Sequence, residues 1–252
     1  MKFYDTIIPL GQYCVTSTAL SRCHLRKETL PFDWSAGILP EAGRLGLEVK
    51  VKLIANDFQD FFNFEYFENR GNNQENDVQN LWIVNKRTGL QYKHDFSSAS
   101  PFEAQFEAVK EKYMRRVKRL YEKIEKAKCP LFLFIARDEG LTDGLLFKQK
   151  EILKGKYPKK DITFLYILHD PYYSEKEYSI DWIDKDICKI ICNVTYSKES
   201  YPESWNGNIE LYYKLLKHFV RMPKFINRLF SKSGKRTMKI KKYKQLGRKH
   251  GK

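Results

Sequence analysis

The chain has 252 residues, of which 42% are apolar and 15% aromatic, and this composition excludes a disordered protein and allows one domain with a sizeable core. Its five cysteines are too few and too scattered for a disulfide framework. Because we find neither an opening signal segment nor an apolar run long enough to span a bilayer, we expect a cytoplasmic protein with reduced thiols.

The net charge of +15 belongs to one end of the chain. Residues 221–252 hold 13 Lys or Arg and no acid, which leaves +2 for residues 1–220. We therefore expect a single catalytic-type α/β domain over 1–220 and a basic C-terminal tail over 221–252. Apolar Phe225 and Phe230 beside these cations favour contact with an anionic membrane surface, at its inner face, over nucleic acid. The alternative is a solvated terminus.

Apolar runs alternate with helical patterns along the chain. Buried strands are expected at four places, residues 3–11, 130–136, 162–168 and 187–196. Helical spacing predicts a short helix after Gly11 and further helices within 39–63, 101–128, 141–157 and 208–220. The segments between them predict an extended 30–34, a polar loop over 68–80 and a β-hairpin over 81–96.

Buried strands that alternate with helices indicate a parallel sheet covered on both faces. We therefore predict an α/β fold, a three-layer, mostly parallel sheet with helices on both faces and the β-hairpin as an excursion. Ligands of such folds collect at the carboxyl ends of the strands. Three polar segments are expected to meet there: Gly11 to Cys14, Arg137 to Gly140, and His169 to Pro171.

Cys14 is the best candidate for chemistry. It follows a strand-ending glycine and opens a helix, where unpaired amides and the helix dipole favour a thiolate, the form that attacks carbonyl and phosphoryl centres. We therefore expect it to be the most reactive of the five thiols and to alkylate below the pH of a free cysteine. The alternative is a small buried hydrophobe. The other four are expected to be buried: Cys23, Cys129, Cys188 and Cys192.

Two histidines qualify as a base for Cys14. His94–Asp95 and His169–Asp170 each stand at the end of a strand, and spacing does not choose between them. Asp33, between two aromatic residues, is expected either to be perturbed by desolvation or to pair with Arg26. No zinc-ligand spacing and no glycine-rich phosphate loop occurs, so neither a metal nor a cofactor is expected.

The segment IPLGQYCVTSTALSRCHLRKETLPFDW (8–34) resembles the opening of a bacterial family labelled putative papain-like cysteine peptidases. The resemblance continues through NDFQDFF (56–62), YKHDF (92–96), KEKYMRRVKRL (110–120) and PLFLFIARDE (130–139), and covers most of residues 5–170. It implies that Cys14 is a nucleophile, that His94 is its base, and that Asp33 or Asp95 orients the base. It also implies a link to surface-polysaccharide synthesis.

Three functional hypotheses follow. The first is a cysteine-dependent enzyme, a peptidase-like hydrolase or an acyl transferase. The second is a transferase that binds a sugar or phosphosugar without a covalent step. The third is a non-catalytic module that binds a glycan or a membrane. The substrate is expected to be a small molecule, a glycan or a peptide, bound by Gly11, Gln12, Arg26, Trp34, Arg137, His169 and Asp170.

Overall fold

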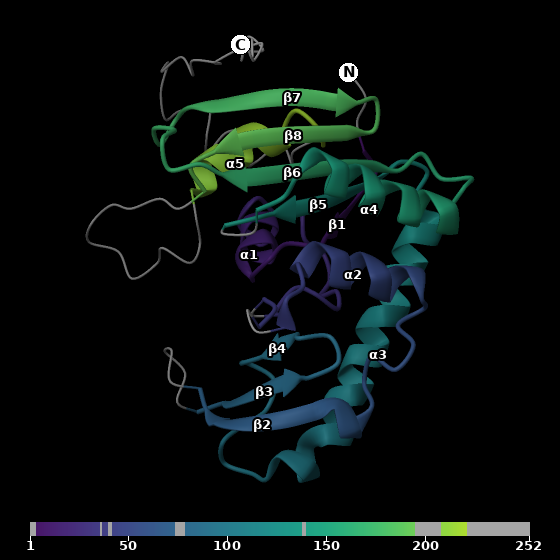
Figure 1. Cartoon of the computed structure of the whole chain (residues 1–252), viewed down its shortest axis with the longest axis vertical. Helices are drawn as coiled ribbons and strands as arrows, with labels where there is room; N and C mark the ends of the chain where they lie inside the picture. The colour runs from purple at the N-terminus through teal and green to yellow at the C-terminus, as the bar shows by residue number, and fades with distance from the viewer. Residues whose placement is uncertain are drawn as a thin grey trace, which may run out of the picture.

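A computed structural model describes residues 4–35, 37–39, 42–73, 79–137, 140–194 and 208–220, so the basic tail lies outside the described residues. A five-stranded sheet has the order β1-β5-β6-β8-β7 (Figure 1). Its strands are β1 (Thr6–Pro9), β5 (Pro130–Ile135), β6 (Thr163–His169), β7 (Tyr178–Asp184) and β8 (Ile187–Cys192). β1, β5, β6 and β8 are parallel, which confirms the prediction, and β7 is an antiparallel edge strand that the sequence analysis missed.

Helices cover both faces of this sheet. On one face lie α1 (Val15–Arg22) and α5 (Ile209–Leu216), and on the other α2 (Gly46–Ala55), α3 (Phe102–Lys126) and α4 (Asp143–Lys156). Alternate residues of β5 serve the two layers, since Leu131 and Leu133 pack with α1 and α5 whereas Phe132 and Phe134 pack on the opposite side. This double burial explains the uninterrupted apolar run, and the three-layer α/β fold is confirmed.

The predicted hairpin belongs to a second, antiparallel sheet of β2 (Phe67–Asn72), β3 (Leu81–Asn85) and β4 (Gln91–Tyr92), preceded by the 3-10 helix η2 (Phe64–Tyr66). Figure 1 shows this sheet at the far end of the molecule, with α3 running alongside both sheets. The polar loop predicted over 68–80 is wrong for its first part, which pairs with β3. Only Phe67 of β2 is buried, so an exposed edge strand leaves no alternating apolar pattern to detect.

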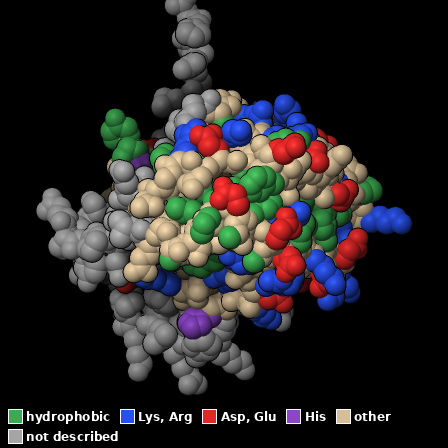
Figure 2. All heavy atoms as spheres, turned by 90° about the horizontal axis from the view of Figure 1, so that it is seen from below, with side chains coloured by type: hydrophobic (Ala, Val, Ile, Leu, Met, Phe, Trp, Pro, Cys, Tyr) green, Lys and Arg blue, Asp and Glu red, His purple; other side chains and the backbone are tan. Residues whose placement is uncertain are grey.

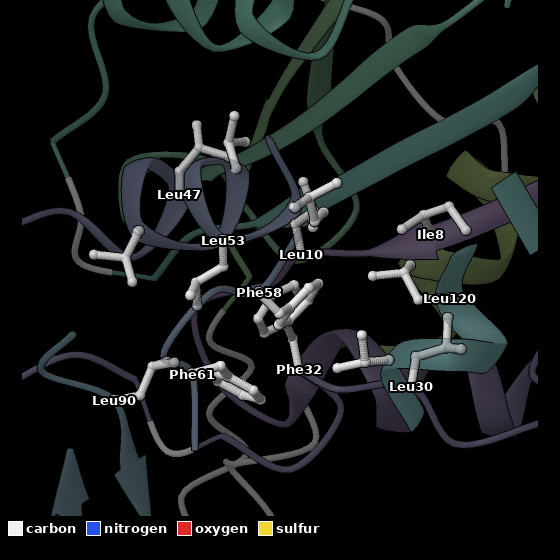
Figure 3. Close-up of a cluster of buried hydrophobic side chains, with 14 of the residues drawn as sticks. Ile8, Leu10, Leu30, Phe32, Leu47, Leu53, Phe58, Phe61, Leu90 and Leu120 are labelled. Carbon is white, nitrogen blue, oxygen red and sulfur yellow. The ribbon is translucent and has the colours of Figure 1, made fainter. Parts of the chain in front are cut away.

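Two local predictions need correction. The helix within 39–63 ends at Ala55, and Asp57, Phe58 and Asp60 then take positive φ values. This irregular turn lets Phe58 and Phe61 enter the core, where Phe58 stacks on Phe32 at a centroid distance of 5.5 Å (Figure 3). Residues 31–34 form a turn instead of an extended segment, because the Asp33 amide donates to the Leu30 carbonyl at 3.3 Å.

Figure 2 shows one face of the molecule, on which acidic and basic side chains are interspersed. In the described part of the chain, no helix combines the length and apolar composition needed to cross a membrane.

Candidate active site

Cys14 is the N-cap residue of α1 and lies just beyond the carboxyl end of β1. The ladder between β1 and β5 extends past the strands, because Leu10 donates to the Leu133 carbonyl at 2.7 Å and Gln12 donates to the Ile135 carbonyl at 3.2 Å. The Cys14 carbonyl then accepts from Thr18, which closes the first turn of α1. Backbone hydrogen bonds therefore fix this cysteine at the sheet edge where ligands of α/β folds bind.

Gly11 is required in this turn by packing. A Cβ at Gly11 would lie 1.6 Å from Oγ1 of Thr16, so no other residue fits unless α1 shifts. The Gly11 carbonyl accepts a hydrogen bond from Nζ of Lys50, a lysine of α2 that is fully buried and lies 5.6 Å from the Phe32 ring centroid. Sequence analysis missed Lys50, although its spacing from Leu47 and Ile54 places it on the buried face of α2.

Arg137 is held beside Cys14 by the segment that precedes the cysteine. Its backbone N–H donates to Oε1 of the buried Gln12 at 2.8 Å, across 125 residues of sequence. Its guanidinium carbon lies 6.0 Å from the centroid of the Tyr13 ring. Gln12 thus joins the ends of β1 and β5 and places a cation next to the thiol.

His169 lies at the same edge. Ile135 pairs with Ile167 in the parallel register of β5 and β6, and Ala136 still donates to Ile167, so Arg137 comes level with His169. Ile135 and Ile167 both pack toward α1 and α5, and the two-residue period of a strand turns Arg137 and His169 to that same side. We call Gln12, Tyr13, Cys14, Arg137 and His169 the strand-end edge.

The hydrogen bond to His169 fixes its tautomer. Nδ1 of His169 accepts from the Val194 N–H at 3.2 Å, so in the neutral ring Nε2 has the proton. Such an Nε2 donates a hydrogen bond and is not available to accept a proton from a thiol. Oδ1 of the next residue, Asp170, accepts from the Tyr172 N–H at 2.9 Å and shapes the turn after β6.

The expected low pKa of Cys14 is wrong. Burial raises the pKa of its thiol, and this outweighs the lowering by a backbone hydrogen bond and by the charge of Arg137. The shift leaves a neutral thiol in the resting protein, so a reaction at Cys14 needs a base. Cys129 is only half-buried, which corrects its expected burial, whereas burial raises the pKa of three other thiols to about 12: Cys23, Cys188 and Cys192.

Asp33 and Arg26 form an ion pair, one of the two alternatives that the sequence left open. The fully buried carboxylate accepts from Nε of Arg26 at 2.9 Å, from the hydroxyl of Ser17 on α1 at 2.7 Å and from the Leu30 N–H at 2.9 Å. The Arg26 guanidinium also lies 5.2 Å from the Trp34 ring centroid. These contacts fasten the turn at 31–34 to α1.

His94 and Asp95 lie in the segment that follows β4. Asp95 accepts from the Tyr113 hydroxyl at 2.6 Å and pairs with Lys112 at 2.8 Å and Arg116 at 3.8 Å, all on α3. His94 is exposed. Within the described residues, neither Asp33 nor Asp95 is hydrogen-bonded to a histidine, and Cys14 is not hydrogen-bonded to His94.

A short path connects the β4 segment to the strand-end edge. The Gly37 carbonyl accepts from the Gln91 N–H of β4 at 3.2 Å. A Cβ at Gly37 would lie 2.8 Å from Cε1 of Tyr13, so the segments that contain these two residues pack against each other. Gly37 has a φ of +94°, which permits this close approach. The segment with His94 therefore begins near the residue that precedes Cys14.

A separate hollow of about 370 Å³ lies between α2 and the β3–β4 turn, and no predicted site residue lines it. Among the described residues, no group of three or more His, Cys, Asp or Glu side chains has the arrangement of a metal site.

Comparison with known proteins places these features in a family. A curated relative, Uncharacterized protein R408 of Acanthamoeba polyphaga mimivirus, is 27% identical over 201 residues, which cover 71% of this chain and 83% of the viral protein. No solved structure matches the chain. The family described as "Putative papain-like cysteine peptidase" matches residues 5–171, about two thirds of the chain and the whole segment from β1 to the turn after β6. The chain belongs to this family of papain-like cysteine peptidases, described as putative.

Proposed function

We propose that this protein is a cysteine-dependent hydrolase or acyl transferase in which Cys14 is the nucleophile and His94 its base. The observation that supports this most directly is the position of Cys14, half-buried at the start of α1 and at the carboxyl edge of a parallel sheet. The family membership supports the same class of chemistry.

The chemistry proceeds through a thioester. His94 takes the thiol proton, the sulfur of Cys14 bonds to the acyl carbon, and the bond from that carbon to the leaving oxygen or nitrogen breaks as the proton passes to the leaving group. Water, or an acceptor hydroxyl or amine, then attacks the thioester and restores the thiol. Because burial raises the pKa of Cys14, the first step depends on a base that removes the thiol proton.

The assignment of the base to His94 has a geometric argument beside the resemblance. His169 is nearer in the topology, but its Nδ1 accepts the Val194 N–H and its Nε2 is a donor. The β4 strand, which His94 follows, contacts Gly37, and Gly37 packs against Tyr13, the residue before Cys14. Catalytic hydrogen bonds commonly tighten only in the substrate complex.

The test is acylation by p-nitrophenyl acetate, followed by mass spectrometry of the Cys14 peptide. We expect a thioester at Cys14 that hydroxylamine removes, and Cys14→Ser to lower the rate by about 10³-fold or more. His94→Gln should cost about 10²- to 10⁴-fold at neutral pH and progressively less as hydroxide deprotonates the thiol. Cys129→Ser and His218→Gln are the matched controls. Acylation unaffected by Cys14→Ser would overturn the proposal.

A second candidate is the transferase that binds a sugar or phosphosugar without a covalent step. The observation that favours it is the pair of donors at the strand-end edge, the guanidinium of Arg137 and the Nε2–H of His169, beside a thiol that burial keeps neutral. Under this hypothesis Cys14→Ser keeps substrate affinity within about threefold, whereas Arg137→Gln abolishes it. Isothermal titration with sugar phosphates distinguishes the two candidates.

A further inference from the structure

The strand-end edge contains more positive charge than the proposed acyl chemistry needs. Arg137 is neither a nucleophile nor a base. Its backbone is nevertheless fixed, because its N–H donates a hydrogen bond to Oε1 of the buried Gln12 at 2.8 Å. Its guanidinium lies against the Tyr13 ring, one residue from the thiol. A guanidinium with fixed geometry matches the paired oxygens of a carboxylate or phosphate.

His169 adds a second donor on the same side. The parallel register brings it level with Arg137, and the pleat turns both side chains toward α1. Because its Nδ1 accepts the Val194 N–H, the Nε2 of the neutral ring has the proton and is a hydrogen-bond donor. Among the described residues, Asp170 follows His169 at this edge, and its Oδ1 accepts from the N–H of Tyr172. Two donors from neighbouring strands thus lie at the same end of the sheet as Cys14, Arg137 after the strand next to β1 and His169 one strand further away.

We propose that the substrate of Cys14 has an anionic group, a carboxylate or a phosphate, that Arg137 binds with the help of His169. This inference rests on the proposed function and adds the substrate class. The anion lies over the ends of β5 and β6, and its neighbouring reactive carbon faces the sulfur. Arg137 then sets specificity, because a neutral substrate leaves the guanidinium without that partner.

Two alkylating reagents of nearly the same shape test this charge directly. With either, the sulfur–carbon bond forms and iodide leaves, but iodoacetate is an anion and iodoacetamide is neutral. The protein supplies its own control in Cys129, which is half-buried at the opposite end of β5 and lies 3.8 Å from Oδ2 of Asp161. The Asp5 carboxylate also accepts the Cys129 N–H, so this second thiol has an acidic setting.

We expect the iodoacetate-to-iodoacetamide rate ratio to be about tenfold or more higher at Cys14 than at Cys129 at low salt, and the difference to shrink in high salt. Arg137→Gln should reduce the Cys14 ratio to that of Cys129, and Arg137→Lys should retain part of it. Equal ratios at the two thiols in the wild-type protein, or a Cys14 ratio that Arg137→Gln leaves unchanged, would overturn the inference.

Protection experiments then separate the two anions. Inorganic phosphate slowing the iodoacetamide reaction at Cys14 indicates a phosphate substrate, and acetate doing so indicates a carboxylate. Protection by neither, at concentrations where salt controls have no effect, counts against the inference. A different result would contradict the proposed function: Cys14 resisting both reagents up to alkaline pH while Cys129 reacts. If Cys14 reacts equally well with both reagents, the proposed nucleophile stands and only the proposed anionic group of the substrate is rejected.

Discussion

Two regions of the molecule contain the polar residues that stand out in the sequence, and they do different work. One is the strand-end edge, where Cys14, Arg137 and His169 follow or end three parallel strands on the same side of the sheet. The other is a pair of buried carboxylates, Asp33 and Asp95, which we call the motif anchors. The carboxylate oxygens of the anchors interact with cations and accept hydrogen bonds from hydroxyls within the fold. The edge lies at the carboxyl ends of the parallel strands, where ligands of α/β folds commonly bind.

The comparison teaches that a conspicuous sequence motif indicates chemistry only when its polar atoms remain available to a ligand. In the PFDW motif Asp33 satisfies Arg26, Ser17 and Leu30, and in the HDF motif Asp95 satisfies Tyr113 and two cations. If the division is correct, substitutions at the anchors lower stability and substitutions at the edge lower reactivity.

The largest effect on stability is expected for Asp33→Ala. It leaves the Arg26 guanidinium, only 17% exposed, without its counter-charge and should cost about 3–5 kcal/mol of unfolding free energy. Urea unfolding measures this. Glu107→Ala is the matched control, because it breaks an exposed pair with Lys110 and should change stability by about 0.5 kcal/mol or less. A loss at Asp33 no greater than this control would show that the motif is not an anchor.

The next largest effect on stability is expected for Asp95→Asn. Lys112 and the buried Arg116 lose their shared carboxylate, at a cost of about 1.5–3 kcal/mol. Burial, and then the Asp95 charge, raises the pKa of Tyr113 well above its usual value. Because the pKa of Tyr113 is higher in the folded than in the unfolded protein, this residue contributes stability that is fully present below the unfolded pKa of about 10. That contribution is lost as the pH rises further, so alkaline unfolding begins above that pH.

Tyrosine absorbance during an alkaline titration checks the second part of this prediction. In the Asn variant the charge that disfavours the phenolate is gone, so Tyr113 ionises at a lower pH than in the wild type. An unchanged titration curve would mean that burial alone controls this phenol.

The strand-end edge gives the third prediction, through Gly11. Gly11→Ala forces a Cβ into Thr16 and displaces the turn that Lys50 holds, at a cost of about 1–3 kcal/mol. The labelling rate of Cys14 should fall further than this loss of folded protein explains. Gly144→Ala is the control, since a Cβ there meets nothing within 4 Å and an alanine in α4 should stabilise by about 0.4–1 kcal/mol.

These residues also show how far the sequence could predict the structure. The parallel strands were predictable because burial on both faces leaves an unbroken apolar run, and parallel strands bring Cys14, Arg137 and His169 to one edge. The partners of Asp33 were only half predictable. Arg26 is near in sequence and was named as one alternative, but the hydroxyl of Ser17 reaches Asp33 only after α1 packs on the turn.

Other features were missed although the sequence contains a signal for them. The spacing of Lys50 from Leu47 and Ile54 fits the buried face of α2, and apolar residues alternate with polar ones over Tyr178–Trp182 in β7. The raised pKa of Cys14 was also missed, because the helix terminus is visible in the sequence and the burial that outweighs it is not. For Cys14, what sequence spacing could not supply was the desolvation of its thiol.

The smallest stability effect is expected at Cys14 itself, and this closes the comparison. Cys14→Ser replaces a half-buried thiol at a helix start by a hydroxyl of similar size, and should cost about 1 kcal/mol or less. Cys192→Ser, the matched variant, puts a hydroxyl into the apolar cluster of α1 and α5 and should cost about 1–3 kcal/mol. Thermal unfolding ranks the two. The Cys14 variant should also lose acylation while the Cys192 variant keeps it, since only the first thiol lies at the strand-end edge. If Cys14→Ser proves the more destabilising of the two, Cys14 is a packing residue and the edge loses its nucleophile.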